Sequence, residues 1–466
     1  MSTATIDVID PSTGETFAEV PQAGQEEVDA AVSAARAAFE QGSDWRKMSP
    51  ADRGKRIHKL AELIDGEADA LAELEARDNG KPVKFARAVD VAGAERHFEY
   101  FAGWPTKIEG RQLPVSAPNT LAYTLREPVG VCAQIIPWNF PLLMAAWKLG
   151  PALAAGCTVV LKPAEQTPMT ALRLGELILE AGIPEGVVNV ITGDGETGAL
   201  LVDHPGVDKI AFTGSTAVGR EIGAKCGKAL KRVTLELGGK SPNIILPDAD
   251  LDAAIKGSFQ AIYYNSGQAC NAGSRLLVQS DLFDEVVSKL ADFASQAKVG
   301  PGLDPDSQFG PVVSAEQYER VTGYIDAGLK EGAEAVAGGM PNGENDNGGY
   351  FVNPTLFTGV DDEMTIAREE IFGPVLVAQP YEDLEEVARR ANDTEYGLAA
   401  GLWTRDISNA HKLAALLRAG SVYVNTWSAS DPAAPFGGFK SSGIGREHGH
   451  DGLDAYLETK SVFVAL

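Results

Sequence analysis

The chain has 466 residues, enough for two or three domain-sized cores. Hydrophobic residues make up 44% of it and charged residues 23%, a composition that is typical of globular proteins and excludes a disordered chain. The formal net charge of −25 predicts a surface that repels nucleic acid and anionic membranes, so neither is expected as a partner.

The first hundred residues are predicted to be helical after a short strand. The segment Met1–Pro11 is polar and mixed, without the basic and apolar regions of a signal peptide. Apolar residues recur at helical spacing over Glu26–Glu40 and over Asp52–Asp78, and Gly80 is expected to end the second helix. Two short strands are then expected, at Ile108–Val115 and Thr120–Arg126.

Between Gly130 and Glu236, short runs rich in β-branched residues alternate with helical stretches. The expected strands are Gly130–Ile136, Thr158–Lys162, Val187–Ile191, Lys209–Thr213 and Arg232–Glu236. The expected helices are Leu142–Ala155, Thr167–Ala181, Glu196–Asp203 and Thr216–Cys226. Such alternation predicts right-handed βαβ units and a doubly wound parallel sheet, which binds ligands beyond the carboxyl ends of its strands.

A second alternating region follows Gly238-Gly239. Its expected strands are Asn243–Leu246, Arg275–Gln279, Pro374–Ala378, Ala399–Trp403 and Ser421–Asn425, and its expected helices include Leu282–Ala297 and Leu384–Ala391. We interpret it as a second doubly wound α/β domain, with the functional cleft between the two domains. The segment Gly338–Gly349, rich in Gly and Asn, is expected to be a surface loop or hairpin.

Cysteine and histidine usage indicates a reduced protein without a bound metal. The four cysteines form no Cys-x-x-Cys pair and no Cys/His cluster, which predicts a cytoplasmic protein without structural zinc. His448 and His450 flank one glycine, and we expect a surface turn there because no other metal ligand lies nearby in sequence. The most apolar stretch, Leu142–Leu161, contains Lys148, two glycines and a proline, so it is expected to be buried rather than to span a membrane.

Two glycine-containing turns are candidates for binding phosphate. The segment Gly193–Gly198, which includes Gly195, matches the G-x-G-x-x-G pattern but follows the third strand, whereas the dinucleotide fingerprint belongs to the first strand–helix turn. We favour a turn at the rim of the cleft and keep a pyrophosphate role as the alternative. The segment Phe212–Gly219 is the better candidate, because it opens a helix whose backbone N–H groups and dipole can face a pyrophosphate. A simple helix cap at Ser215 or Thr216 is compatible with that role.

Two further strand ends carry polar residues. Lys162-Pro163-Ala164-Glu165 ends the second strand, where a carboxylate can hold the adenine ribose and repel a 2′-phosphate. A solvated Lys/Glu pair is the equally weighted alternative. The segment Pro137–Pro141 ends the first strand, and its rigid turn can aim the amide of Asn139 at a developing oxyanion, although such a segment is more often only a turn.

Cys270 differs from the other cysteines in its surroundings. It lies in the small and polar loop Gly267–Arg275, whereas Cys132, Cys157 and Cys226 lie in apolar strands or on a helix and are expected to be buried. A cysteine in a Gly-rich loop can react as a thiolate when its surroundings stabilise the charge. Spacing alone leaves both a catalytic and a structural role open for Cys270.

Seven motifs occur along the chain in a fixed order. They are PWNFP at Pro137, KPAEQTP at Lys162, FTGSTAVG at Phe212, LELGGKSP at Leu235, GQAC at Gly267, EEIFGPV at Glu369 and PFGGFKSSG at Pro435. These motifs resemble those of the aldehyde dehydrogenase superfamily over essentially the whole chain, which looks most similar to the hydrolytic, broad-specificity, NAD-dependent branch. The resemblance implies an enzyme that oxidises an aldehyde to a carboxylic acid through a thioester.

The resemblance implies a role for each residue at the reaction centre. Cys270 matches the nucleophile, Glu236 the general base that activates water, and Asn139 the amide of an oxyanion hole. Lys148 and Glu447 resemble the residues of a proton path. The branch that passes the acyl group to coenzyme A lacks the glutamate, so Glu236 favours water as the acceptor. Coenzyme A as acceptor, NADP as cofactor and a structural, crystallin-like role are the alternatives.

The resemblance also implies the residues that hold NAD. Lys162 and Glu165 match those at the adenine ribose, and Glu370 and Phe372 match those at the nicotinamide ribose and ring. The remaining cofactor contacts are expected from Pro137, Trp138, Gly195, Phe212, Gly214, Ser215, Gly219 and Leu237.

By the same resemblance, an aromatic and mostly apolar channel leads to the nucleophile. Its lining is expected from Phe140, Leu143, Met144, Trp147, Tyr264, Trp427 and Phe436. Such a channel suits aliphatic or aromatic aldehydes, and its rings can also hold the quaternary ammonium of betaine aldehyde. Ala269, Asn271 and Trp427–Ser430 depart from the common pattern of the branch at positions that tune the choice of substrate.

The resemblance divides the chain into three parts. Residues 1–108 and 127–238 are expected to form the NAD-binding domain, 239–440 the catalytic domain, and 109–126 with 456–466 an oligomerisation element. The apolar tail Val462–Val464 needs burial, which favours this role over a frayed terminus. We therefore expect a homodimer or, as a dimer of dimers, a homotetramer.

Overall fold

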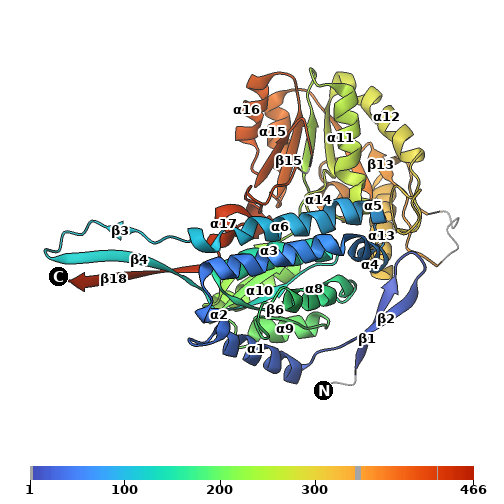
Figure 1. Ribbon diagram of the computed structural model, residues 1–466. Coiled ribbons are helices and arrows are strands. Elements are labelled where there is room, and N and C mark those ends of the chain that lie inside the picture. The colour runs from blue at the N-terminus through green and yellow to red at the C-terminus, as the bar shows by residue number, and fades with distance from the viewer. Residues whose placement is uncertain (1–3, 342–347, 428) are drawn as a thin grey trace.

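The computed structural model describes residues 4–341, 348–427 and 429–466. Two open sheets, each covered by helices, form two lobes, and a narrow three-stranded sheet projects from them (Figure 1). The predicted fold class, two doubly wound α/β domains with a small β element, is confirmed. Residues 1–3 of the polar segment Met1–Pro11, residues 342–347 of the predicted loop Gly338–Gly349, and Ser428 lie outside the described residues.

The N-terminal region forms a hairpin and a layer of helices. The hairpin is β1 (Thr5–Asp10) with β2 (Glu15–Pro21), and the helices are α1 (Gln25–Phe39), α2 (Asp44–Lys47), α3 (Pro50–Gly66), α4 (Ala68–Asn79), α5 (Val83–Phe85), the π-helix Ala86–Val91 and α6 (Ala92–Ala102). The single helix predicted over Asp52–Asp78 is wrong, because Glu67, with φ −109° and ψ 17°, leaves the helical region between α3 and α4. Gly80 ends α4 as predicted, since its φ of 89° is the left-handed conformation that suits glycine.

The first large sheet follows the predicted alternation. Its strands are β5 (Val131–Ile135), β6 (Thr158–Lys162), β7 (Val188–Val190), β8 (Lys209–Thr213), β9 (Arg232–Glu236) and β17 (Gly443–Ile444), in the order β17-β9-β8-β5-β6-β7. Its helices are α7 (Pro141–Ala155), α8 (Met169–Glu180), α9 (Gly195–Asp203) and α10 (Thr216–Ala229). Alternate residues enter different cores: Val131 and Ala133 pack with α1 and α10, whereas Cys132 packs with α7 and α8. Among the described strands of this sheet, β17 alone runs antiparallel to its neighbour, and it brings the C-terminal part of the chain back to this sheet.

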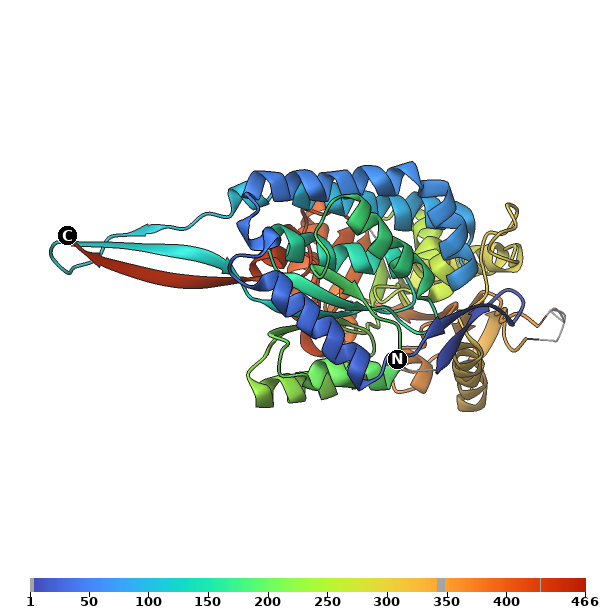
Figure 2. The same cartoon turned by 60° about the horizontal axis from the view of Figure 1, so that its bottom comes forward.

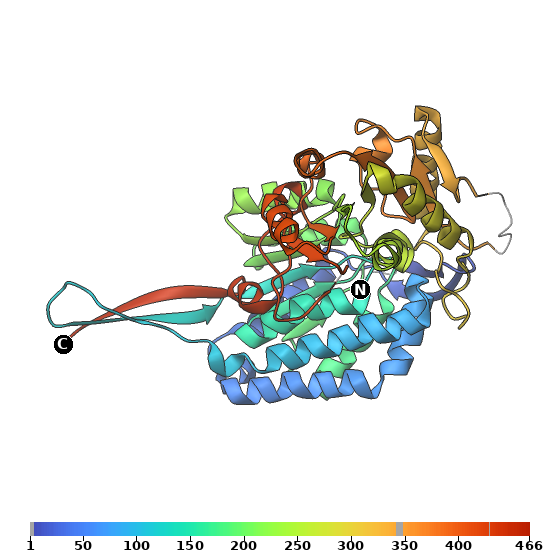
Figure 3. The ribbon, with the colours of Figure 1, turned by 90° about the horizontal axis from the view of Figure 1, so that it is seen from above.

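The second large sheet has the order β12-β13-β14-β11-β10-β15-β16. Its strands are β10 (Pro242–Ile245), β11 (Arg275–Gln279), β12 (Glu334–Ala337), β13 (Thr355–Thr358), β14 (Val375–Tyr381), β15 (Ala399–Trp403) and β16 (Ser421–Val424). Its helices are α11 (Leu251–Tyr263), α12 (Phe283–Ser295), α13 (Ala315–Glu331), α14 (Thr365–Arg368), α15 (Leu384–Asn392) and α16 (Ile407–Leu416). The last helix, α17 (Gly449–Asp454), packs on α7 of the first lobe. Strands β12 and β13 escaped prediction. Figure 3 shows the yellow-to-orange elements of this sheet gathered on one side of the molecule and α3 and α6 on the other.

The three-stranded sheet forms an arm that projects from the body (Figure 2). Strand β18 (Leu457–Ala465) pairs antiparallel with β4 (Thr120–Pro128), which also pairs with β3 (Gln112–Leu113). The strand predicted over Ile108–Val115 therefore shortens to two residues, because the rest of that segment makes no ladder with β4. Apolar side chains of the arm, including Phe463 at 63% and Leu466 at 81% exposure, face solvent in the single chain.

The apolar stretch around α7 is buried inside the first lobe. Each of its 15 residues, Lys148 included, is buried among neighbouring helices and the sheet. Over the parts of the chain that the structure describes, no helix has the length and apolarity needed to cross a bilayer.

Candidate active site

A cavity of about 460 Å³ lies where the two sheets meet. The first sheet contributes the segments that follow β5 and β8 and the end of β9, and the second lobe contributes the loops around residues 270 and 370. The carboxyl ends of parallel strands meet at one edge of a sheet, which is why segments distant in sequence converge here. The cavity wall thus includes Asn139, Glu236 and Cys270.

Most of the residues predicted for the site line this cavity. They are Pro137, Trp138, Asn139, Phe140, Leu143, Met144, Trp147, Gly214, Ser215, Glu236, Leu237, Tyr264, Cys270, Glu370, Phe372 and Phe436. The others lie outside its lining: Lys148, Lys162, Glu165, Gly195, Phe212, Gly219, Trp427 and Glu447. Three of the positions expected to tune the choice of substrate, Ala269, Asn271 and Ser430, also line it. The lining further includes Val89, Glu316, Gln317, Arg320 and Tyr423, for which the sequence offered no local signal.

Cys270 lies in the loop between α11 and β11 and is partly exposed to the cavity. Before it, Asn265, Ser266 and Gly267 all have positive φ, so the chain turns sharply into the loop. A Cβ on Gly239 would lie 2.3 Å from the Cys270 carbonyl oxygen, which explains why glycine stands there. Burial, followed by the nearby carboxyl group of Glu370, raises the pKa of the Cys270 thiol to about 12. At neutral pH the group is therefore a thiol.

Asn139 is held close to the Cys270 loop. Its side-chain Nδ2 donates a hydrogen bond to the backbone carbonyl of Gln268 at 2.9 Å, two residues before the cysteine. A side-chain amide has two N–H groups, so the second remains free to donate toward the cavity. The backbone carbonyl oxygen of Asn139 accepts hydrogen bonds from Lys81 and Asn265. The amide is thus fixed from both its backbone and its side chain.

Glu236 ends β9 as a buried carboxyl group on the cavity wall. Neither of its oxygens has a hydrogen-bond partner among the described residues. Burial, followed by the charge of Glu447, raises the pKa of Glu236 well above its ordinary value. Glu447 itself forms a buried ion pair with Lys148, whose Nζ lies 2.5 Å from its Oε1. A carboxyl group with a raised pKa is a stronger base than an ordinary glutamate, which suits it to accept a proton from water.

Glu370 and Phe372 form the wall of the cavity on the side of the second lobe. Glu370 accepts a hydrogen bond from the backbone N–H of Gly239 at 2.9 Å, and burial raises its pKa to about 7. The Phe372 ring meets the Trp138 ring edge to face at 5.2 Å. Arg320 donates to the Glu370 carbonyl at 2.6 Å, so α13 holds this segment in place.

The starts of α9 and α10 differ in their suitability for a phosphate. Asp194 caps α9 with a carboxylate that accepts from the N–H groups of Glu196 and Thr197, and this negative charge opposes an anion. Ser215 caps α10 with a neutral hydroxyl and itself lines the cavity. Gly195 therefore stands at the less suitable helix start, as the strand order had suggested.

The remaining cofactor candidates lie beside or beneath the cavity. Lys162 and Glu165 form an ion pair of 3.7 Å at the end of β6, outside the cavity lining. The Phe212 side chain packs into the core of the first sheet. Gly219 lets α10 approach Leu237, because a Cβ there would lie 2.3 Å from Leu237 Cδ2.

Aromatic rings form the opposite part of the cavity. The Phe140 ring stacks with Tyr264 at 6.1 Å, and the Trp147 ring meets Phe436 edge to face at 5.2 Å. The prediction that Trp427 lines this part is not met. A Cβ on Gly401 would lie 2.2 Å from the Trp427 ring, which packs behind the wall and leaves Tyr423, 5.5 Å away, to line it.

The prediction of a surface turn at His448 is wrong. His448 is buried, and its Nε2 lies 3.0 Å from Nε2 of His97, while its ring meets the Trp147 ring at 4.0 Å. Burial lowers the pKa of His97 to about 4 and that of His448 well below its ordinary value, so both rings are neutral at pH 7. Of the two histidines that flank Gly449, His448 is buried and His450 is exposed. Within residues 4–341, 348–427 and 429–466, no three His, Cys, Asp or Glu side chains gather as metal ligands.

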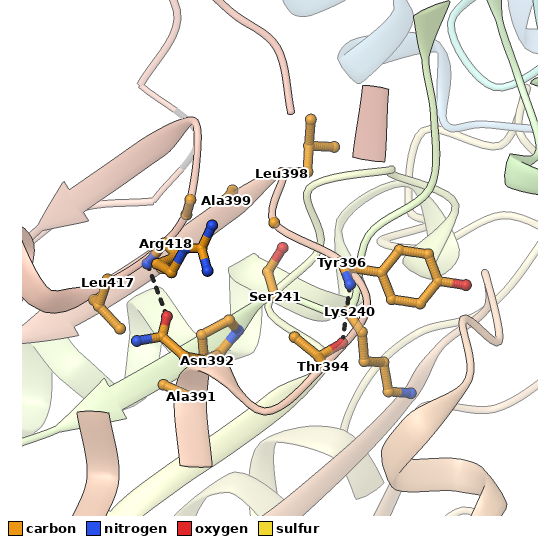
Figure 4. A pocket seen from close by; sticks show the side chains of 14 residues that line it. Lys240, Ser241, Ala391, Asn392, Thr394, Tyr396, Leu398, Ala399, Leu417 and Arg418 are labelled. Atoms are coloured by element: carbon orange, nitrogen blue, oxygen red, sulfur yellow. Dashed lines mark hydrogen bonds between the residues drawn. The ribbon is translucent and has the colours of Figure 1, made fainter. Parts of the chain in front are cut away.

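A second, much smaller cavity lies beside β10 and β15 (Figure 4). Its volume of about 10 Å³ suits one water molecule and neither an aldehyde nor a nucleotide. Lys240 Nζ and Ser241 Oγ on its wall have no hydrogen-bond partner among the described residues, and burial lowers the pKa of Lys240 to about 7. The small cavity is therefore no candidate for the functional site.

Comparison with known proteins agrees with this site. The model of the aldehyde dehydrogenase family matches residues 1–462. DhaS of Bacillus subtilis, named provisionally as an aldehyde dehydrogenase, is 55% identical over all of this chain and 93% of its own length, and human mitochondrial aldehyde dehydrogenase is 49% identical over all of this chain and 89% of its own length. The NAD⁺ complex of a Bacillus cereus aldehyde dehydrogenase is 52% identical, with a TM-score of 0.97 over 99% of this chain and 94% of that one. The chain therefore belongs to the aldehyde dehydrogenase family and is an NAD-dependent aldehyde dehydrogenase.

Proposed function

We propose that the protein oxidises aldehydes to carboxylic acids through a thioester on Cys270, which water hydrolyses with Glu236 as general base. The observation that carries this proposal is the convergence of Cys270, Asn139 and Glu236 on one cavity from three separate segments of the chain. Each has the chemical property that its role requires: a thiol that can become a nucleophile, a fixed amide donor, and a carboxyl group with a raised pKa.

In the first half of the reaction, the Cys270 thiol releases its proton to water, the thiolate sulfur forms a bond to the aldehyde carbon, and the carbonyl π electrons move to the oxygen. The resulting oxyanion accepts hydrogen bonds from the free N–H of Asn139 and from the backbone N–H of Cys270. A positioned donor of this kind contributes roughly 10²–10³-fold to the rate. Departure of the carbon-bound hydrogen as hydride restores the carbonyl and leaves a thioester.

In the second half, Glu236 takes a proton from water while the water oxygen attacks the thioester carbon. The carbon–sulfur bond then breaks, which releases the acid and returns the Cys270 thiolate. Glu236 is buried and must pass its proton to another group. Lys148 and Glu447 form an ion pair, and the charges of both residues influence the pKa of Glu236. We assign the proton path to this pair.

The residues present fit NAD, which accepts the hydride when it is bound. The N–H groups at the start of α10, beside Gly214 and Ser215, suit a pyrophosphate. Glu370 offers a carboxylate to the ribose nearer the reaction, and Lys162 with Glu165 suit the adenine ribose. The charge of Glu165 disfavours a 2′-phosphate and hence NADP.

The substrate is proposed to be an aliphatic or aromatic aldehyde, because aromatic and apolar side chains dominate its side of the cavity. Solved structures similar to this chain include an indole-3-acetaldehyde dehydrogenase at 44% identity and a betaine aldehyde dehydrogenase of Staphylococcus aureus at 40%. The names of these two proteins show that one fold serves aldehydes of different chemistry. The aromatic rings of the present cavity can bind the quaternary ammonium of betaine aldehyde through cation–π contacts, so this aldehyde is a second candidate substrate.

An assay of NADH formation over a panel of short aliphatic, aromatic and amino-aldehydes tests this function. We expect one carboxylic acid per NADH, no acceleration by added coenzyme A, and slower turnover with NADP than with NAD. An increase in rate with coenzyme A, accompanied by a new thioester in solution, would instead assign an acyl transfer.

The projecting arm is proposed to join copies of the chain. Among the described strands, β18 pairs with β4 on one side and leaves its other side open to a further strand. Phe463 on β18 is exposed in the single chain, and contact with a second copy would bury this apolar side chain. Light scattering is expected to give two or four times the mass of one chain. Phe463→Asp should lower this mass, whereas Ile407→Asp, at a residue 69% exposed on α16, should not. A monomer mass for the unmodified protein would contradict the proposal.

Four free cysteines favour a reducing compartment such as the cytoplasm.

A further inference from the structure

A buried lysine lies behind the loop that carries Asn139. Lys81 follows α4 and is 2% exposed. Its Nζ donates to the carboxylate of Asp90 at 2.6 Å and to the backbone carbonyl of Asn139 at 2.8 Å, and it lies 4.3 Å from the centre of the Phe140 ring. Burying an ammonium group is costly unless its hydrogen bonds are all made, so this placement holds the lysine and its partners in one arrangement.

The same region of the chain holds the neighbouring backbone groups of the loop. Asn79 donates from Nδ2 to the carbonyl of Trp138 at 2.7 Å. Glu75 accepts from the backbone N–H of Leu142 at 3.3 Å, at the start of α7. Burial, followed by the charge of Asp90, raises the pKa of Glu75 well above its ordinary value and so favours its neutral form. Lys81 Nζ lies 2.6 Å from Asp90 Oδ1 and 3.8 Å from Glu75 Oε1, so Asp90 is its nearer carboxyl partner.

The contact at Asn139 continues into the loop that carries Cys270. The Asn139 carbonyl also accepts from Nδ2 of Asn265 at 3.0 Å, and that nitrogen lies 3.1 Å from the Gln268 carbonyl. The Asn139 side chain donates to the same Gln268 carbonyl at 2.9 Å. A closed set of hydrogen bonds therefore joins Lys81, Asn139 and the segment two residues before Cys270. A shift of the Asn139 backbone would move its amide relative to the sulfur.

We propose that Lys81 is a positioning residue for the reaction, which fixes the backbone of Asn139 and thereby aims its side-chain amide at the oxyanion. This role rests on the proposed function of Asn139 as oxyanion donor. It predicts a loss of kcat that exceeds any change in NAD affinity, because Lys81 touches neither the start of α10 nor Glu370. A displacement of about 1 Å at such a centre lowers a rate by roughly 10²-fold.

The test uses Lys81→Met together with Asp90→Asn, because removal of the lysine alone would leave a buried carboxylate without its partner. We expect the double variant to lose about 10–100-fold in kcat while the dissociation constant of NAD stays within about two-fold. Asp90→Asn alone keeps the contact between Lys81 and Asn139 and leaves Glu75, 3.8 Å from Lys81 Nζ, as a carboxyl partner of the lysine, so this variant should lose much less. Lys84→Met, at an exposed lysine on α5, is the matched control and should behave as wild type.

A double-mutant cycle with Asn139→Ala separates positioning from a general structural effect. If Lys81 acts through the Asn139 amide, the Lys81→Met/Asp90→Asn change should cost less than about two-fold once the amide is absent. Equal losses in the presence and absence of the Asn139 amide would overturn the inference. An unchanged rate for Asn139→Ala alone would contradict the proposed function instead, so the two failures are distinguishable.

A variant that keeps the positive charge at position 81 tests the inference even if the double variant does not fold. Lys81→Arg preserves the ion pair with Asp90, but its planar guanidinium cannot reproduce the geometry of a compact ammonium between Asp90 and Asn139. We expect a folded protein with at least about five-fold lower kcat and unchanged NAD affinity. Wild-type kcat in Lys81→Arg would overturn the inference even if the double variant does not fold.

Discussion

Replacement of Cys270 by alanine is expected to abolish aldehyde oxidation, with a loss of roughly 10⁴-fold or more. Without the sulfur no bond to the aldehyde carbon forms, and no other cysteine can substitute because Cys132, Cys157 and Cys226 are buried. The affinity for NAD should be retained, since the thiol is no part of the start of α10. NADH formation and calorimetric titration with NAD measure the two effects separately.

The raised pKa of Cys270 allows a second test of its role, the pH dependence of its alkylation. With a pKa of about 12, the thiolate fraction should rise about ten-fold per pH unit between pH 7 and 10, and alkylation by iodoacetamide should rise with it. The anionic form is the reactive one, and the negative charges of Glu370 and Glu236 oppose it. Glu370→Gln should therefore lower the pKa and speed alkylation at neutral pH. The positive charge of NAD⁺ should act in the same direction.

Two results would contradict the role of Cys270. One is a Cys270→Ala variant with activity within ten-fold of wild type. The other is alkylation of the active protein at Cys226 with a parallel loss of activity, which would identify Cys226, on α10, as the reactive thiol. Cys226→Ala is the matched control, and it should oxidise aldehydes at a normal rate, because its side chain packs in the core of the first sheet.

The strands of the first sheet were predictable because their chemistry is local. Runs such as Val131–Ile135 and Thr158–Lys162 are buried on both faces, and only short, β-branched, apolar segments suit such strands. Strand β12 (Glu334–Ala337) escaped because it is an antiparallel edge strand, mostly not fully buried, whose composition matches that of a loop. The break between α3 and α4 escaped because the helical spacing of apolar residues continues across Glu67.

The site could be predicted only in part for a related reason. Cys270 stood out by its loop and Asn139 by its rigid turn between two prolines, but each of these signals left a purely structural role open. Glu236 carries no local signal, so the roles of all three residues were named through the resemblance of whole motifs. Lys81 and Arg320 act through backbone carbonyl groups of distant residues, a property that no spacing in the sequence reveals. His448 was misjudged because its partner His97 lies 351 residues away in the chain.

Glu236→Gln is expected to separate the two halves of the reaction. Glutamine has the shape of the carboxyl group and the neutral charge of its protonated form, so the fold and NAD binding should persist. Formation of the thioester does not need the base, and each active site should therefore release one NADH in a rapid burst. Hydrolysis does need it, and steady-state turnover should fall by roughly 10²–10⁴-fold.

The pH profile of turnover provides an independent test of Glu236 as the general base. A general base acts only after losing its own proton, and burial with Glu447 nearby raises the pKa of Glu236 well above its ordinary value. Wild-type turnover should therefore rise with pH through an inflection well above pH 4.5, the ordinary value for a glutamate, and Glu236→Gln should lack that inflection. Glu369→Gln, at an exposed carboxylate before Glu370, is the matched control and should keep the wild-type profile.

Rapid-quench kinetics and mass spectrometry then decide what accumulates. In Glu236→Gln, the mass of the quenched protein should increase by one acyl group at Cys270, because the thioester forms faster than water removes it. An unchanged steady-state rate would show that another group activates water. A burst that is lost together with turnover would place Glu236 before hydride departure, as the base that deprotonates the Cys270 thiol. Turnover restored by an added small nucleophile such as hydroxylamine, which needs no general base, would locate the defect at hydrolysis itself.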